Sequence, residues 1–145
     1  MTAVSGLVLL DTNVVLFLVR GNDFGRRIDA AYNLRQRPER PLISVVNVGE
    51  LLGFARYRNW GEGLVTRLRA FLDELVIVDI NEAVVEKYAF FHDFLLKNGK
   101  HTGQNDLWIA ATAAVASATL ITTDGDFDPL AGEHLKLSRF LLDPK

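Results

Sequence analysis

The stretch Gly6-Leu-Val-Leu-Leu-Asp11 leads from four consecutive apolar residues directly to a carboxylate. A short apolar run of this kind, without helical periodicity on either side, is typical of a strand buried on both faces of a parallel sheet. Residues 12–19 have the pattern of a helix, which Arg20-Gly21-Asn22 would end. A buried strand followed directly by a helix is the repeating unit of α/β proteins, and it indicates the fold class.

The remainder of the chain repeats this alternation of strand and helix. Further strands are predicted at 42–46, 75–80 and 119–122, with an edge strand at 135–137. Helices are predicted over 24–37 and 64–72, and from Asn47, Asn81 and Asn105 or Asp106 onward. The chain has no internal repeat, linker or low-complexity segment. We therefore expect one domain over residues 1–145, an α/β/α three-layer sandwich around a mainly parallel sheet of four or five strands.

The composition fits a single globular domain and excludes several other classes. With 145 residues, of which 49% are hydrophobic, the chain is long enough to bury a core. It has no cysteine, which excludes disulfides and thiolate metal sites. No apolar run approaches the roughly 18–20 residues of a membrane span. The short run before Asp11 follows no basic residue, so a signal peptide is not expected and the chain is interpreted as cytoplasmic.

The charges are distributed unevenly along the chain. Residues 20–69 contain ten arginines and five acids, whereas residues 70–145 contain six basic residues and twelve acids. A solvated helical face is the simplest interpretation of such a charge run. Next to a metal site, however, arginine side chains would also suit a phosphodiester substrate, because the planar guanidinium matches the geometry of a phosphate.

Four carboxylates, Asp11, Glu50, Asp106 and Asp124, each stand at the start of a helix or turn that follows an apolar strand. In a wound α/β sheet these junctions lie along one edge, outside the carboxyl ends of the strands. Carboxylates gathered there would repel one another unless a divalent cation lay between them. No lysine or arginine lies within three residues of Asp11 or Asp106. The sequence therefore predicts a Mg²⁺ or Mn²⁺ site.

Each of the four acids also has a purely structural explanation. Asp11 and Asp106 could cap their helices, and Asp124-Gly125 is ordinary turn chemistry. The segment Asn47-Val-Gly-Glu50 has the spacing of a capping box. Taken one at a time these explanations are as good as a metal site, but four unrelated caps need not share one edge of a sheet.

Other chemistries find less support. His92, His101 and His134 lack the spacing of zinc ligands, although His101, in the polar loop 97–103, could contact a substrate. The segment that begins at Asp124 resembles the start of a calcium loop, but it has Pro129 where that loop needs glycine. A phosphatase of the Asp-x-Asp type would need an acid at the position of Asn13.

Four segments carry a resemblance to a known family. They are Leu-Leu-Asp11-Thr12-Asn13-Val-Val-Leu, Val-Asn-Val-Gly-Glu50-Leu, Asn-Asp106-Leu-Trp-Ile-Ala-Ala and Leu-Ile-Thr122-Thr-Asp124-Gly-Asp-Phe127. In this order, from residue 6 to about residue 127, they resemble the motifs of PIN-domain nucleases, and most of all the VapC-type toxins of bacterial toxin–antitoxin pairs. The ordered set, rather than any single motif, carries the resemblance.

The resemblance implies a Mg²⁺- or Mn²⁺-dependent endoribonuclease with a PIN-like fold. The acids that match Asp11 and Asp106 would be the most direct metal ligands, and those that match Glu50 and Asp124 would complete the site, often through water. The matching polar positions that orient the acids, and a further acid that could add a ligand, are Thr12, Asn13, Thr122 and Asp126.

The resemblance also implies partners. Family members usually form homodimers, and the toxins are held inactive by an antitoxin protein that covers the cleft. The segments 23–40 and 56–69, which contain most of the arginines, are where an antitoxin or RNA would dock.

The residue types favour one mechanism and leave other functions open. A metal-activated water would attack phosphorus and leave 5′-phosphate and 3′-hydroxyl ends, because no paired histidine acid and base is present for attack by the 2′-hydroxyl. The alternatives are a stand-alone RNA-processing nuclease, a metal-dependent hydrolase of small phosphate esters, and a catalytically silent interaction module.

Overall fold

The sheet lies at the centre of the molecule. The computed structural model describes residues 4–142. Its five strands have the order β3-β2-β1-β4-β5, and every neighbouring pair is parallel. The strands are β1 (Val8–Leu10), β2 (Leu42–Ser44), β3 (Val76–Val78), β4 (Thr119–Thr122) and β5 (Leu137–Arg139). The predicted α/β sandwich with a mainly parallel sheet of four or five strands is thus confirmed.

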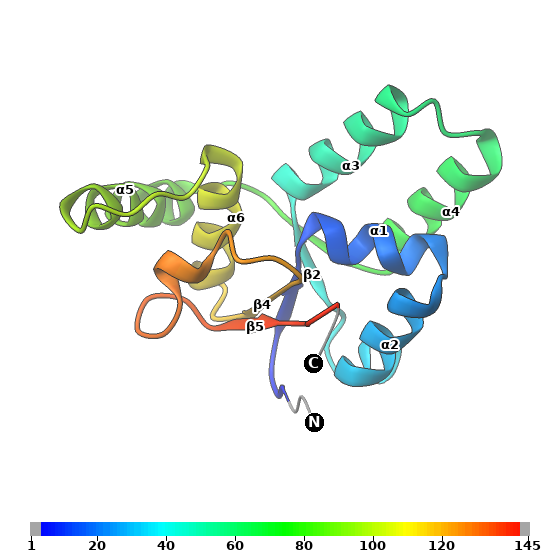
Figure 1. Ribbon diagram of the computed structural model, residues 1–145, viewed down its shortest axis with the longest axis horizontal. Helices are drawn as coiled ribbons and strands as arrows, with labels where there is room; N and C mark the ends of the chain where they lie inside the picture. The colour runs from blue at the N-terminus through cyan, green and yellow to red at the C-terminus, as the bar shows by residue number, and fades with distance from the viewer. Residues whose placement is uncertain (1–3, 143–145) are drawn as a thin grey trace.

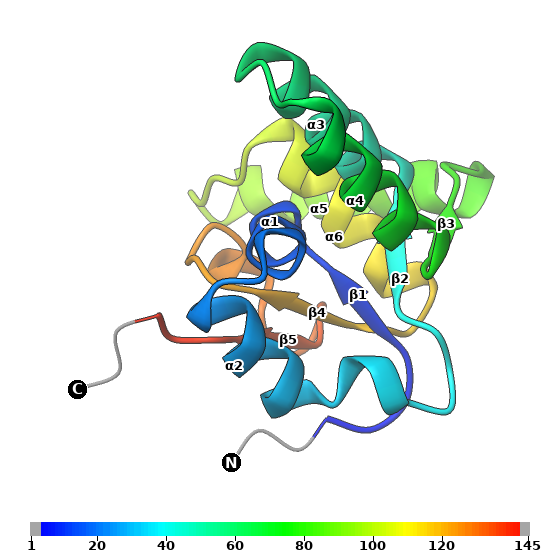
Figure 2. The same ribbon diagram turned by 90° about the vertical axis from the view of Figure 1, so that its right-hand side faces the viewer.

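Within residues 4–142, six helices cover the two faces of this sheet (Figures 1 and 2). On one face lie α1 (Thr12–Arg20), α2 (Asp23–Tyr32), α3 (Val45–Tyr57) and α4 (Glu62–Asp73), and on the other α5 (Glu82–Lys97) and α6 (Gln104–Val115). The strand order reverses between β1 and β4, with β2 and β3 on one side and β5 on the other. In open α/β sheets such a switch point is where a ligand crevice forms, outside the carboxyl ends of the strands.

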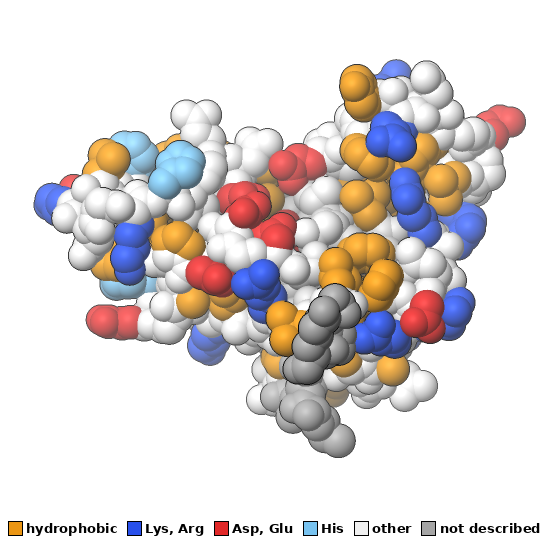
Figure 3. All heavy atoms as spheres, in the orientation of Figure 1, with side chains coloured by type: hydrophobic (Ala, Val, Ile, Leu, Met, Phe, Trp, Pro, Cys, Tyr) orange, Lys and Arg blue, Asp and Glu red, His pale blue; other side chains and the backbone are white. Residues whose placement is uncertain are grey.

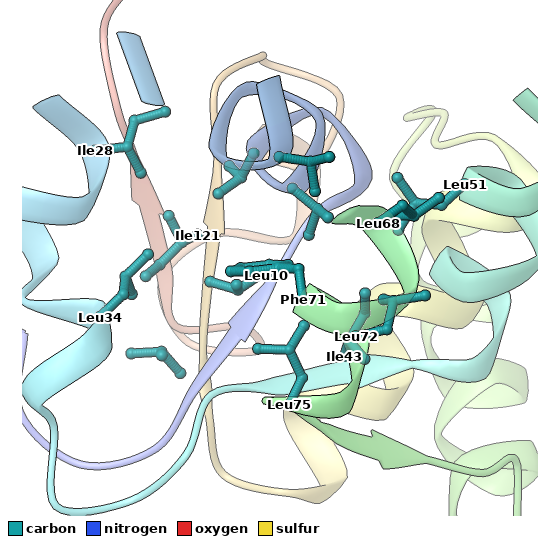
Figure 4. Close-up of a cluster of buried hydrophobic side chains, with 14 of the residues drawn as sticks. Leu10, Ile28, Leu34, Ile43, Leu51, Leu68, Phe71, Leu72, Leu75 and Ile121 are labelled. Carbon is teal, nitrogen blue, oxygen red and sulfur yellow. The ribbon is translucent and has the colours of Figure 1, made fainter. Parts of the chain in front are cut away.

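Alternate side chains of the strands enter two separate apolar clusters. Leu10, Ile43 and Ile121 pack under α1, α3 and α4, together with Leu68 and Leu72 of α4 (Figure 4). On the other face the neighbouring residues of the same strands pack against α5 and α6; these are Leu9, Leu42 and Leu120. Because β1 is buried on both faces, its end is held rigidly, and so is the acid that follows it.

Several predicted boundaries differ from the structure. The helix expected from Asn47 begins at Val45, because Ser44 at the end of β2 serves as its N-cap. The Ser44 hydroxyl accepts a hydrogen bond from the Val46 amide, and the Asn47 side chain accepts one from the Ser44 amide. The capping box therefore runs from Ser44 to Asn47, and the one predicted from Asn47 to Glu50 was wrong.

Two other elements are displaced for local reasons. The helix expected over 24–37 ends at Tyr32, because Asn33 adopts a left-handed conformation and a short 3-10 turn follows at Leu34–Gln36. The edge strand expected at 135–137 is β5, at Leu137–Arg139. No helix within residues 4–142 has the length and apolar character needed to cross a membrane.

Candidate active site

Asp11 lies at the switch point between β1 and β4 and contacts both strands. It follows β1 and caps α1, and its Oδ1 accepts a hydrogen bond of 2.8 Å from the Thr12 amide. Its Oδ2 accepts one of 2.7 Å from the hydroxyl of Thr122, the last residue of β4. The side chain is only 5% exposed. The cap predicted on structural grounds is therefore real, and the same carboxylate also faces the crevice.

Glu50 is held by polar side chains of three elements. The Thr12 hydroxyl donates a hydrogen bond of 2.6 Å to Glu50 Oε1, and in turn accepts one of 2.9 Å from Asn47 Nδ2. Asn105 Nδ2, in the first turn of α6, donates one of 3.1 Å to Glu50 Oε2. This network fixes the Glu50 carboxylate between α1, α3 and α6.

Asn47 and Asn105 were not predicted as members of the site. Asn47 is fully buried, and it lies one turn before Glu50 on the same face of α3. Asn105 directly precedes Asp106. These spacings were the available signals, but a spacing alone does not reveal which side chain an amide will reach.

Asp124 is held by the turn that follows β4. Its Oδ2 accepts a hydrogen bond of 2.8 Å from Asn13 Nδ2, and its Oδ1 accepts one of 3.0 Å from the Asp126 amide. Its own amide donates to the Thr122 hydroxyl at 3.4 Å. Of the polar residues named from the resemblance, Thr12, Asn13 and Thr122 each donate a hydrogen bond to an acid. Asp126 contacts Asp124 through its backbone amide and has an exposed side chain.

Asp106 differs from the other three acids because its carboxylate has no hydrogen bond to any group within residues 4–142. It lies in the first turn of α6, whose N-cap is Gly103, so the prediction that it caps the helix was wrong. The expectation that it follows an apolar strand was also wrong, because α6 follows α5 and the loop 98–103. Partial burial, and then the charges of Asp126, Glu50 and Asp124, raise its pKa to about 6. Asp106 is thus the acid among the four whose charge no hydrogen bond from the described residues offsets.

The pKa of Asp11 is raised further, to about 7, chiefly by burial. The hydrogen bonds from Thr122 and Thr12 act in the opposite direction, and the charges of Asp124 and Asp106 contribute to the rise. The pKa of each of these two acids is therefore raised in part by the charges of neighbouring acids, as expected for carboxylates that lie around one space.

That space is an open pocket of about 290 Å³ at the carboxyl edge of the sheet. Acidic side chains gather at the same place in Figure 3, between the lobe of α5 and α6 and the lobe of α1 to α4. The pocket is lined by all four predicted carboxylates, by two polar side chains and by two apolar ones; these are Asp11, Glu50, Asp106, Asp124, Thr12, Asn13, Leu16 and Phe54.

The residues of the pocket fit a hydrated divalent cation. None of the salt bridges found within residues 4–142 involves any of the four acids. The buried Asn13 Oδ1 has no hydrogen-bond partner in that part of the chain. As they stand, no three Asp, Glu or His side chains of the described residues are arranged to enclose a metal. Mg²⁺ commonly takes only one or two carboxylates and keeps several waters, which an open pocket allows.

Several arginines expected to contact phosphate are instead engaged with backbone carbonyls. Arg37 donates to the carbonyls of Val4, Gly6 and Tyr32, at 2.7–2.8 Å. Arg40 donates to three carbonyls at the end of α4, at 2.8–3.1 Å. Both residues precede β2, at the edge of the sheet opposite the acids. Arg37 and Arg40 therefore stabilise loops. No arginine from 35 to 40 lines the carboxylate pocket, so this part of the segment 23–40 is not where RNA would meet the acids.

The histidines lie outside the carboxylate pocket. His92 stacks on Tyr88 with ring centroids 6.2 Å apart, and His134 packs edge-on against Phe94 at 4.4 Å. His101 lines a separate hollow beside His92. The polar loop that contains His101 is exposed except for Thr102. The Thr102 hydroxyl donates to the Asp126 carbonyl at 3.3 Å.

Comparison with known proteins agrees with this geometry. The model of the PIN domain matches residues 8–133. Ribonuclease VapC5 of Mycobacterium tuberculosis is 30% identical over 128 residues, which cover 86% of this chain and 87% of that protein. Ribonuclease VapC2 of Haemophilus influenzae is 26% identical over 116 residues, which cover 80% and 85%.

Among solved structures, VapBC2 from Rickettsia felis bound to a DNA fragment from their promoter has a similar fold. Its TM-score is 0.79 at 24% identity, and the match covers 92% of this chain and 98% of that one. Four acids line one pocket at the carboxyl edge of a parallel sheet, and the PIN-domain model matches residues 8–133. The chain belongs to the PIN-domain family.

Proposed function

We propose that this protein is a divalent-metal-dependent endoribonuclease and the toxin of a VapBC-type toxin–antitoxin pair. The observation that carries the proposal is the convergence of four carboxylates from four separate segments on one pocket without a basic partner. The names of the VapC relatives, which are ribonucleases, support RNA as the substrate. An RNA substrate in turn favours the cytoplasm as the site of action.

Asp11 and Asp106 are the direct ligands of Mg²⁺ or Mn²⁺ in this proposal, and Glu50 and Asp124 contribute through water. A bound cation would polarise a phosphoryl oxygen and lower the pKa of a water molecule. The hydrogen bonds of Thr12 and Thr122 hold one oxygen each of Glu50 and Asp11, so that the remaining lone pairs face the pocket. The side chains are thereby oriented before any substrate arrives, which is the usual role of residues behind metal ligands.

The products expected are 5′-phosphate and 3′-hydroxyl ends. In this reaction the oxygen of a water molecule forms a bond to phosphorus, the bond from phosphorus to the 3′-oxygen breaks, and that oxygen leaves with a proton. Attack by the neighbouring 2′-hydroxyl would need a paired acid and base such as two histidines. The side chains that line the pocket include no histidine.

An antitoxin would dock beside the carboxylates. The pocket wall is formed by Leu16 of α1 and Phe54 of α3, both half-buried, and Trp60 packs edge-on against Phe54 at 6.0 Å. Arg20 lies over Trp60 and Arg58 lies over Phe54. An apolar segment with acidic side chains would complement this surface, and covering it would close the pocket.

A second copy of the chain would cover the β3 edge of the sheet. Val76, Ile77 and Val85 are 41–47% exposed there, and Ile80 lies between them in the chain. An exposed apolar edge strand is a liability in a monomer unless something covers it. We therefore place the interface of the expected homodimer at β3 and the start of α5.

The test is cleavage of total and synthetic RNA by the wild type and by Asp106→Asn, each in Mn²⁺ and in EDTA. Cutting by the wild type in Mn²⁺ alone supports a carboxylate–metal nuclease. Cyclic phosphate products would contradict the mechanism, and substantial activity of Asp106→Asn would contradict the ligand assignment. Hydrolysis of small phosphate esters without RNA cleavage, or no activity after any bound partner is removed, would favour the small-ester hydrolase or the silent module. A short upstream reading frame that encodes a DNA-binding protein would separate a toxin from a stand-alone nuclease.

A further inference from the structure

Arg139 lies against the turn that carries Asp124 and Asp126. A Cβ atom placed on Gly125 would be 3.1 Å from Arg139 Nη1 and 3.6 Å from its Cζ. The guanidinium therefore covers Gly125 directly, and glycine provides the space for it. The sequence explained Gly125 only as turn chemistry, so this contact adds a second reason for the glycine. A basic side chain also borders the central acidic group in Figure 3.

The backbone of Arg139 is fixed at the same edge of the sheet as the carboxylate pocket. Arg139 ends β5 and is paired with Thr122 of β4, and the next amide, that of Phe140, donates to the Thr122 carbonyl at 2.8 Å. Paired residues of neighbouring strands lie about 5 Å apart. Since the Thr122 hydroxyl also holds Asp11, the β5 residue is tied to the same strand end as the carboxylates.

The side chain of Arg139 is held only lightly. Its Nη1 lies 3.5 Å from Asp128 Oδ2, and the two side chains are 43% and 56% exposed. An ion pair this exposed contributes little to stability, so a phosphate could replace the carboxylate at small cost. Within residues 4–142 neither its Nε nor its Nη2 donates a hydrogen bond. The guanidinium can therefore present a pair of parallel donors to a ligand.

The charge of the pocket explains why a cation is needed at this position. One divalent cation neutralises only half of the charge on four ionised carboxylates. Phosphates on either side of the cleaved bond would then meet a surface that is still negative. A cation beside the turn of Asp124 would offset this repulsion, whereas Arg37 and Arg40 cannot, because they donate to carbonyls at the opposite edge of the sheet.

We propose that Arg139 binds an RNA phosphate next to the cleaved one, exchanging Asp128 for the substrate as the strand crosses the turn at Gly125. The inference rests on the proposed nuclease function and adds a substrate-binding residue to it. Arginine suits this task because its planar fork can hold two phosphate oxygens at once.

The experiment measures binding of fluorescein-labelled single-stranded RNA by anisotropy over a series of KCl concentrations, in Mg²⁺. Every protein carries Asp106→Asn so that the RNA stays intact. Arg139→Ala should weaken binding roughly tenfold, the loss expected for a charge-assisted contact. It should also reduce the slope of log affinity against log salt by about 0.7, the value for one phosphate contact on a single strand. Arg139→Lys should keep most of the slope.

Asp128→Asn separates a substrate contact from a structural ion pair. If Arg139 binds phosphate, removal of the competing carboxylate leaves RNA affinity equal or higher, opposite to Arg139→Ala. If the pair only stabilises the turn, both variants lose the same amount. Arg35→Ala is the matched control, because Arg35 also pairs with acids, Asp29 at 3.4 Å and Glu74 at 3.2 Å, but lies before β2 at the far edge. It should leave affinity and slope unchanged.

Cleavage kinetics in the background that retains Asp106 give an independent readout. Loss of a contact made equally in the ground and transition states raises KM while kcat stays within a few-fold. Equal affinity and equal slope for Arg139→Ala and its parent, with RNA cleavage by the wild type intact, would overturn the phosphate assignment alone. No RNA binding by the parent and no cleavage by the wild type would overturn the nuclease function together with it.

Discussion

The hydroxyl of Thr122, at the end of β4, donates a hydrogen bond of 2.7 Å to the buried Oδ2 of Asp11, at the end of β1. This bond crosses the point where the strand order reverses. It connects the acid that caps α1 with the strand that leads to Asp124, so that the two halves of the sheet hold one carboxylate between them. The relationship makes Thr122 the residue whose loss should affect both stability and activity.

Thr122→Val should destabilise the protein and impair cleavage. Valine has nearly the same shape but leaves the buried Asp11 without its strongest hydrogen bond, at a cost of about 1–3 kcal/mol in the free energy of unfolding. RNA cleavage should fall at least tenfold, because the carboxylate loses its fixed orientation. Thr123→Val, one residue later, is the control, and urea unfolding with cleavage assays gives both readouts. Equal behaviour of the two variants would show that the bond to Asp11 has no special role.

Asp106→Asn should stabilise the metal-free protein while it abolishes cleavage. Burial and three neighbouring acids raise the pKa of Asp106 to about 6. Removing that unfavourable charge should add roughly 1–2 kcal/mol at pH 7.5, after a discount for partial exposure. The midpoint of thermal unfolding in EDTA should rise by a few degrees, about 2–4 °C per kcal/mol for a chain of this length. Asp93→Asn, on an exposed residue paired with Lys97, should produce no such rise.

The stability of the metal-free protein should decrease as the pH rises from 4 to 7. The pKa values of Asp11 and Asp106 are raised to about 7 and about 6. Between the ordinary value near 4 and these values, the folded state binds more protons than the unfolded state, so the free energy of unfolding falls with increasing pH. The total change is on the order of 3–5 kcal/mol. Thermal unfolding in EDTA at pH 5 and at pH 7.5 measures it, and greater stability at pH 7.5 would contradict the raised pKa values.

Mg²⁺ should offset part of this loss at pH 7.5. A cation present at ten times its dissociation constant adds about 1.4 kcal/mol to the free energy of unfolding. The stabilisation should be much smaller for Asp106→Asn and unchanged for Asp93→Asn. A thermal shift with MgCl₂ that is identical in all three proteins would mean that the cation binds elsewhere.

The sequence predicted the positions of the acids better than the connections between them. Asp11 and Asp124 were found because a polar residue after an apolar strand must emerge at the sheet edge. Asp106 reaches the same pocket from the start of α6, which follows α5 and not a strand. The cap at Ser44 was missed because its side chain belongs to the last position of a buried strand, where the strand signal outweighs the cap signal.

The roles of Asn47, Asn105 and Arg40 could not be predicted, for a different reason. Asn47 reaches α1, Asn105 reaches α3, and Arg40 reaches the end of α4. Each contact depends on how separate elements approach one another in space, and neither spacing nor charge count contains that information. Residues 20–69 are rich in arginine, but composition does not show which guanidinium groups already have carbonyl partners.

Gly125→Ala should weaken RNA binding without removing any charge. The new methyl group would meet Arg139 Nη1 at 3.1 Å and Asp128 Oδ2 at 3.2 Å, both ends of flexible side chains, so the guanidinium must shift by a few tenths of an ångström. The cost in the free energy of unfolding should stay below about 1 kcal/mol. The two side chains can shift, and alanine lowers the conformational entropy of the unfolded chain, which favours the folded state. RNA affinity should fall below that of the parent but by less than in Arg139→Ala, although the net charge is unchanged. Gly63→Ala, where nothing lies within 4 Å of the added atom, is the control and should bind RNA normally. If Gly125→Ala binds RNA as tightly as Gly63→Ala in the anisotropy assay, the position of Arg139 over the turn is not what its function requires.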